Sequence, residues 1–133
     1  MFDVSGEWWA LNLADGWEAH VDEHCVTISH PDGVGVLQVS AYRKSGTILS
    51  RDDILQATQL QPEMYKHLGE QTWGDFHGFQ LVYAHSDIFW RRWWLANGSV
   101  SVFITYNCEK RDEDKELVPV NDMLASLRAI SKN

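Results

Sequence analysis

The chain has 133 residues, 44% of them hydrophobic and 23% charged, which is typical of one globular domain. Nineteen Asp and Glu against eleven Lys and Arg give a net charge of −8, and seven residues are Trp. These values exclude a disordered chain and a generic nucleic-acid binder, because an acidic surface repels phosphates. No apolar run approaches the roughly 18 residues that a membrane-spanning helix needs.

The first nine residues favour a cytoplasmic location. They contain acidic residues but neither the basic nor the apolar region of a signal peptide. In a reducing compartment we expect Cys25 and Cys108 to be two small core residues, since a disulfide between them would require a secreted precursor.

The N-terminal third predicts short strands. One covers Glu7 to Leu13 and ends at the Asp15-Gly16 turn, and a second covers 17–22. β-Branched residues at 25–29, turn residues at 31–33 and a further strand at 35–42 predict a hairpin over 25–42.

A helix is predicted to begin at Ser50. Its hydroxyl can cap the free backbone amides, and Asp52 and Asp53 lie at the positive end of the helix dipole. Pro62 ends or kinks this helix, and a second helical piece is expected to stop at Gly69.

From Thr72 to Cys108 the sequence predicts a β-meander, with breaks at 77–78, 86–87 and 97–98. A closing helix carries an apolar stripe of Val120, Met123, Leu124, Leu127 and Ile130. We therefore predict one α+β domain over 1–133, an antiparallel sheet of about six to seven strands (hairpin plus meander) packed with two or three helices.

Asn97-Gly98 is a strong hairpin signal and sets the expected register of the meander. Taken as a two-residue loop, it pairs the following residues on one sheet face: Leu95 with Val100, Trp93 with Val102, Arg91 with Ile104, and Phe89 with Tyr106. That face is apolar except for Arg91 and is the expected core. The opposite face carries Trp94 beside Ser101, Arg92 beside Phe103, and Trp90 beside Thr105.

Large aromatic residues and a guanidinium on the second face allow two interpretations. Another layer covers the face and Arg92 stacks on Trp as packing, or the face forms a groove or partner interface. In the second case the candidate binding residues are Trp90, Arg92, Trp94, Phe103 and Thr105, with Trp94 and Arg92 partly exposed.

The loop at Ser86-Asp87 leaves one register open. Two loop residues would place Phe79, Leu81 and Tyr83 on the Trp90 face, and three would place them on the core face. We favour three, because this concentrates the apolar residues. The same reasoning places Trp8, Trp9, Trp17, Trp90 and Trp94 outside the main core stripe, although either Trp8 or Trp9 can still join the core.

No motif in the sequence predicts catalysis, a metal or a cofactor. His20 and His24 are spaced as helical ligands but fall in a strand, where four residues span about 13 Å. Glu109 beside Cys108 would raise the pKa of a thiol rather than lower it. We predict no catalytic residue, no metal ligand and no cofactor.

The order of elements is similar to the Mog1/PsbP-like group. The residues that carry the resemblance are Asp15-Gly16-Trp17, 35–40, 50–53, Phe89-Trp90-Arg91, Thr105-Tyr106 and 123–127. The resemblance implies a central antiparallel sheet flanked by helices on both sides. It also implies a binding role without a common catalytic set, since the group includes a Ran-GTPase binder, photosystem II extrinsic subunits and proteins similar to effector chaperones.

These observations lead to a functional hypothesis of a non-catalytic cytoplasmic domain that binds another protein, in the manner of a chaperone or an immunity protein. The acidic charge favours a basic partner and not a nucleic acid or a membrane, and a self-complementary aromatic face would also allow a homodimer. The alternative is a small-molecule pocket, or an enzyme with an aromatic-lined cleft, under Trp73, Trp90 or Trp94.

Overall fold

The fold is built on a seven-stranded antiparallel sheet. In the computed structural model, which describes residues 3–130, its strands are β3 (Glu18–Val21), β4 (Val26–Ser29), β5 (Gly35–Arg43), β6 (Gly69–Trp73), β7 (Phe76–His85), β8 (Ile88–Asn97) and β9 (Val100–Glu109). They lie in the order β3-β4-β5-β9-β8-β7-β6. A separate sheet has the order β1-β2-β10 and consists of β1 (Val4–Ser5), β2 (Trp9–Leu11) and β10 (Arg128–Ala129).

Two α-helices and two short 3₁₀ helices complete the described part of the chain. Between β5 and β6 lie α1 (Arg51–Ala57) and the 3₁₀ helix η1 (Pro62–His67), and after β9 come η2 (Lys110–Asp112) and α2 (Leu117–Ala125). The predicted α+β fold and the hairpin at 25–42 are confirmed. The strand expected at 7–13 belongs to the small sheet, because β2 pairs with β1 and with β10 from the opposite end of the chain.

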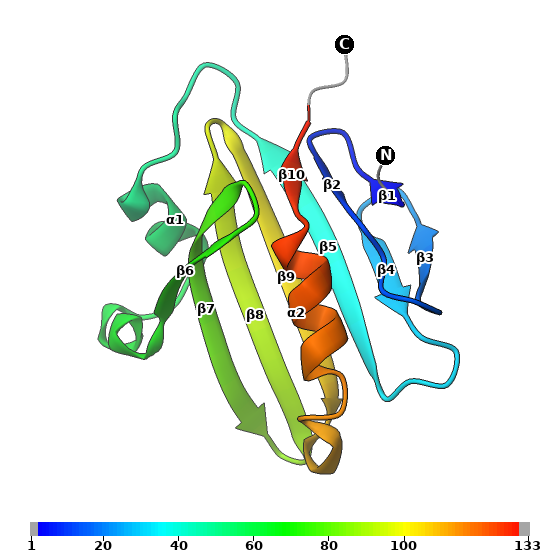
Figure 1. Ribbon diagram of the computed structural model, residues 1–133. Helices are drawn as coiled ribbons and strands as arrows, with labels where there is room; N and C mark the ends of the chain where they lie inside the picture. Colours follow the sequence, from blue (N-terminus) through cyan, green and yellow to red (C-terminus); the bar gives the residue numbers. More distant parts are fainter. Residues whose placement is uncertain (1–2, 131–133) are drawn as a thin grey trace.

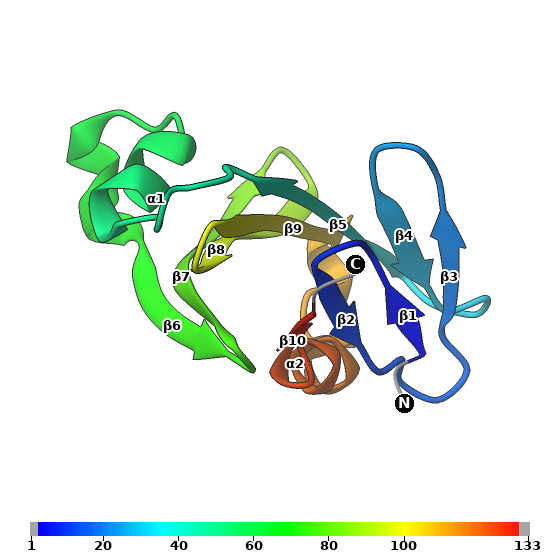
Figure 2. The same cartoon turned by 90° about the horizontal axis from the view of Figure 1, so that it is seen from above.

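The large sheet is covered differently on its two faces. We call the face that carries Phe89 and Trp93 of β8 the inner face, and the face that carries Trp90 and Arg92 the outer face. Helix α2 and the small sheet lie on the inner face, and α1 lies on the outer face against β7 and β8 (Figures 1 and 2). The main core therefore lies on the inner side. Its fully buried side chains include Leu11, Leu37, Phe76, Trp93, Ile104 and Met123.

The hairpin between β8 and β9 turns one residue later than predicted. Asn97 pairs with Val100, so the loop is Gly98-Ser99, and Trp93 pairs with Ile104 rather than with Val102. Gly98 has φ +59°, as the first loop residue of a type II′ turn requires. The predicted partners were thus wrong by two residues, but an even shift leaves every side chain on its predicted face.

The hairpin between β7 and β8 has the shorter of the two loops considered. His85 pairs with Ile88 across a two-residue loop, and Ser86 adopts φ +54° to make the turn. The favoured three-residue loop is therefore wrong. Phe79, Leu81 and Tyr83 pair with Trp94, Arg92 and Trp90, so these three side chains lie on the outer face.

The break predicted at His77-Gly78 is also wrong, since both residues lie inside β7 and the turn falls at Gly74-Asp75. Gly78 has a packing role instead. A Cβ atom at this position would lie 2.0 Å from the carbonyl oxygen of Trp94 on the paired strand. Glycine is required here because the backbone of β8 approaches too closely for any side chain.

The helix start at Ser50 is confirmed. Its hydroxyl accepts a hydrogen bond from the Asp53 amide at 3.1 Å, and the Asp53 carboxylate accepts one from the Ser50 amide at 2.8 Å, which forms a capping box. The closing helix is shorter than predicted and ends at Ala125, so Leu127 is buried from the following turn and Ile130 lies beyond the helix.

Several tryptophans are more buried than the sequence predicted. Trp9 is 2% exposed, Trp17 7% and Trp94 6%, whereas Trp8 and Trp90 are half-buried. The small sheet accounts for Trp9, because it packs β2 onto the inner core. Trp17 belongs to the main core, so the expectation is wrong for this residue, and Trp9 joins the core as the sequence left open. Trp94 is buried on the outer face and lies outside the main core, as expected.

We expect Gly78→Ala to destabilise the fold. Overpacking against a rigid strand backbone costs about 1–3 kcal/mol, and the reduction should be visible as a lower midpoint in urea unfolding. Gly69→Ala is the matched control, because Gly69 also lies in a strand but a Cβ there would meet nothing within 4 Å. Equal stability of the two variants would contradict the close approach of β7 and β8.

Candidate functional site

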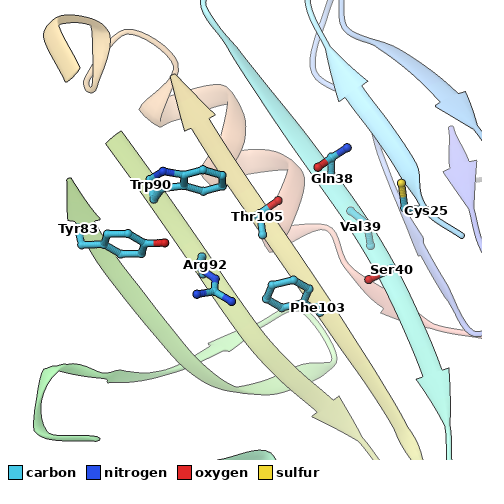
Figure 3. Close-up of a pocket in the computed structure, with 9 residues that line it drawn as sticks. All are labelled: Cys25, Gln38, Val39, Ser40, Tyr83, Trp90, Arg92, Phe103 and Thr105. Carbon is cyan, nitrogen blue, oxygen red and sulfur yellow. The ribbon is translucent and has the colours of Figure 1, made fainter. Parts of the chain in front are cut away.

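The outer face is hollowed by two adjoining pockets, which we call the outer groove. The larger has a volume of about 370 Å³ and the smaller about 270 Å³, and Arg92 and Phe103 line both. The larger pocket is also lined by Cys25, Gln38, Val39, Ser40, Tyr83, Trp90 and Thr105, as Figure 3 shows. The smaller is lined by Ala57, Thr58, Gln59, Trp94, Leu95, Ser101 and Val102.

All five residues predicted from the sequence line the outer groove. Arg92 is half-buried, as expected, but Trp94 is only 6% exposed, so its predicted exposure is wrong. Helix α1 packs against β7 and β8, and Ala57 and Thr58 at its end line the same pocket as Trp94. Each of the two interpretations of the outer face therefore applies to one end of it. The end under α1 is packed, and the end at Trp90 forms an accessible groove.

Cross-strand pairing sets the aromatic surface of the groove. Tyr83 and Trp90 are direct partners with ring planes within 10° and centroids 6.4 Å apart. Trp94 and Phe103 are also direct partners, with centroids 5.7 Å apart. Tyr83 was missed because the three-residue loop placed it on the wrong face. The Ser86-Asp87 signal for a two-residue loop could have found it.

The Arg92 guanidinium contacts rings and not acceptors. Its carbon lies 4.8 Å from the Trp94 ring centroid and 5.4 Å from that of Phe103. Figure 3 shows its side chain between Tyr83 and Phe103. Within residues 3–130, its nitrogens make no hydrogen bond and no ion pair. The donors of Arg92 are therefore left to water or to a bound molecule.

Arg91 has the opposite environment on the inner face. It is 6% exposed, and its Nη2 donates to Gln80 at 3.1 Å and to Asn121 of α2 at 2.8 Å. Its guanidinium also stacks 4.5 Å from the Trp93 ring. Burial lowers the pKa of Arg91 to about 10, so the side chain stays charged at neutral pH. Arg91 therefore ties α2 to the sheet.

Polar groups line the other side of the groove. Gln38 and Ser40 of β5 and Thr105 of β9 present amide and hydroxyl groups to the larger pocket, and Cys25 lies at its rim. Cys25 and Cys108 are both free thiols. Cys108 is 4% exposed, and burial raises its pKa. The sequence indicated Thr105 but gave no signal for the β5 residues, since their pairing with β9 is a long-range contact.

A hydrogen-bonded network lies outside the groove, where α1 meets the β6–β7 hairpin. His77 is 2.6 Å from the Thr72 hydroxyl through Nδ1 and 2.8 Å from Glu70 through Nε2, and Arg51 donates to Glu70 at 3.3 Å. The His77 and Glu70 side chains are 53% and 42% exposed. In the described part of the chain, no three His, Cys, Asp or Glu residues are grouped as metal ligands.

The comparisons with known proteins support the fold. No family model matches the sequence, and no curated protein matches it. A protein of Bacteroides thetaiotaomicron VPI-5482 superposes with a TM-score of 0.71 at 16% identity; the match covers 94% of this chain and 46% of that one. This chain thus spans about half the length of the Bacteroides protein.

A second solved structure with this fold is LpqN of Mycobacterium tuberculosis, described as involved in cell envelope biogenesis. It superposes with a TM-score of 0.58 at 12% identity, over 91% of this chain and 82% of LpqN. At such identities both likenesses show the fold alone. Neither description names the Mog1/PsbP-like group. None of the helices in residues 3–130 has the length and apolar character needed to cross a bilayer.

We expect adjacent arginines to differ in their effect on stability. Arg91→Ala should lower the free energy of unfolding by about 2 kcal/mol, because Gln80 and Asn121 lose a charged donor. Arg92→Ala should lower it by less than about 1 kcal/mol, the value of a partly exposed cation–π contact. Urea unfolding of both variants measures the difference, and equal losses would show that Arg92 is mainly a packing residue.

The network around Glu70 should make stability depend on pH. The hydrogen bond from His77 and then the Arg51 contact lower the pKa of Glu70 below its usual 4.5. The carboxylate therefore stabilises the fold above about pH 4.5, and this contribution is lost as the pH falls through the lowered folded-state pKa.

The measurement is the melting temperature of wild type and Glu70→Gln between about pH 5.5 and about pH 3. At the higher pH the wild type should melt at a higher temperature than Glu70→Gln, and this difference in melting temperature should shrink on acidification. Glu63→Gln is the control, since Glu63 in the first turn of η1 has no ion pair within residues 3–130. A constant difference across this range would argue against the network.

Proposed function

We propose that this chain is a non-catalytic binding domain that holds a segment of a partner protein in the outer groove. The observation that carries the proposal is a half-exposed aromatic surface, Trp90 and Tyr83, beside a guanidinium without a protein acceptor among the described residues. Trp, Tyr and Arg are the residues that most often dominate binding energy at protein interfaces.

The position of the groove supports this proposal. The main core is built on the inner face, so the Trp90 end of the outer face is not needed to close it. The groove floor lies on β7, β8, β9 and β5, which are held by continuous strand pairing. A rigid, preformed surface lowers the entropy cost of binding.

The alternative is a small-molecule pocket. The volume of about 370 Å³ falls within the range of roughly 300–1,000 Å³ that such sites occupy. We favour a protein segment because two pockets adjoin and share Arg92 and Phe103, which suits an extended chain. The lining offers aromatic, hydroxyl, amide and guanidinium groups, a set suited to binding more than to acid–base chemistry.

The proposal includes a basic partner protein and a cytoplasmic location. The net charge of −8 favours association with a basic protein through long-range attraction. The two free thiols suit the reducing cytoplasm. A chaperone or an immunity protein would act in this way, and the resemblance to the Mog1/PsbP-like group also implies binding.

Trp90→Ala should weaken partner capture. We expect a protein retained by the immobilised wild type from cell extract to bind the variant at least about tenfold more weakly, as for an interface hot spot. Tyr42→Ala is the matched control, because Tyr42 is 66% exposed and lies outside both pockets. Affinities are then measured with the purified partner, and circular dichroism checks the fold of each variant.

Two results would contradict the proposal. One is a set of captured proteins that is identical for wild type and Trp90→Ala. The other is a saturable change in Trp fluorescence caused by a small molecule and abolished by Trp90→Ala, with no protein captured. The second result would favour the small-molecule pocket.

A further inference from the structure

We infer that the segment held in the outer groove presents a carboxylate to Arg92, next to an apolar or aromatic side chain that packs on Trp90 and Tyr83. This inference rests on the proposed function and specifies the chemistry of the partner segment. An acidic group on the bound segment differs from the expectation for the partner as a whole, because the net charge of this chain favours a basic protein.

Arg92 differs from the other arginines of the chain. Each of the others has an acceptor within the protein: Arg43 on Ser99, Arg51 on Glu70, Arg91 on Gln80 and Asn121, Arg111 on Glu109, and Arg128 on Leu127. Arg92 contacts only ring faces within residues 3–130, although it is half-buried. A charge removed in part from water without an acceptor is a group that a ligand can satisfy.

The two rings also orient this guanidinium. Trp94 and Phe103 lie within cation–π distance of its carbon, so the planar group is held against aromatic surface. The N–H donors of a guanidinium lie in its plane and form a fork that matches a carboxylate with two parallel hydrogen bonds. A single arginine suits a singly charged carboxylate, because proteins bind phosphorylated segments with clusters of arginines.

The charge of the lining favours the same ligand. The chain has nineteen acidic residues, but neither pocket is lined by Asp or Glu. A carboxylate in the groove would therefore meet one positive charge and no negative one in the first layer of contacts. A Lys or Arg of the partner would meet Arg92 as a like charge. The acids elsewhere on the surface act at longer range, where salt screens them.

The rest of the larger pocket suits an extended segment around that carboxylate. Gln38, Ser40 and Thr105 offer donors and acceptors for its backbone. Trp90 and Tyr83 offer apolar surface for the neighbouring side chain.

Three blocked tripeptides test the inference: acetyl-Phe-Glu-Phe-amide and its analogues with Gln or Lys at the centre. Binding is followed by NMR at low salt with millimolar peptide, and independently by protection of Cys25, at the groove rim, from a thiol reagent. We expect the Glu peptide to bind about tenfold more tightly than the Gln peptide, because a charged acceptor strengthens the bonds to Arg92. The Lys peptide should bind most weakly.

Three variants locate the effect. Arg92→Gln should remove the preference for Glu over Gln, and Arg43→Gln, which alters an exposed arginine outside both pockets, should keep it. Trp90→Ala should weaken all peptides alike and leave the preference in place. Rising salt should reduce the preference for Glu.

Four results would each overturn the inference. The Glu and Gln peptides could bind equally, or the Lys peptide could bind most tightly. None of the three could bind, or the preference for Glu could survive Arg92→Gln. The proposed function would stand if capture of the partner still depended on Trp90 but not on Arg92. Binding of 3-phenylpropionate as tightly as the Glu peptide would identify a small acid as the occupant, and the proposed function would then fail as well.

Discussion

The register of the β7–β8–β9 meander is the constraint on which both the core and the groove depend. Side chains alternate between the faces of a strand, so the pairing of Tyr83 with Trp90 and of Trp94 with Phe103 fixes which aromatic residues share the outer face. Each of the two hairpins has a two-residue loop with one positive φ angle, at Ser86 and at Gly98. A change of one residue in the length of either loop would exchange core and groove residues along a whole strand.

Adjacent arginines show how this alternation separates stability from binding. Arg91 points into the core, where amide oxygens of Gln80 and Asn121 accept hydrogen bonds from its Nη2. This polar link is placed beside the buried Trp93, whose indole Nε1 has no acceptor within residues 3–130. Arg92 points to the opposite face and meets only rings. One residue type, repeated at successive positions, thus holds the helix on one face and leaves free donors on the other.

Coverage of the outer face is uneven for a simple geometric reason. Helix α1 has seven residues, which at 1.5 Å each give a length of about 10 Å, so it covers only part of strands that are ten residues long. Trp94, near one end, is buried, and Trp90 is half-exposed. The inner face, in contrast, has both α2 and a second sheet on it. The accessible groove is the part of the sheet that no other element reaches.

Local chemistry in the sequence determined a substantial part of this structure. Turn residues and β-branched runs predicted the α+β class and the 25–42 hairpin. Ser50 predicted the helix cap, and alternation along 89–95 predicted the two faces of β8. These features could be predicted because each depends on neighbouring residues alone. The five predicted groove residues line the groove for the same reason. Only the tertiary structure decided the cover of α1 over Trp94, the pairing of β2 with β10, and the absence of an acceptor for Arg92 among the described residues. These features depend on contacts between segments far apart in the chain, whose energies no local pattern contains.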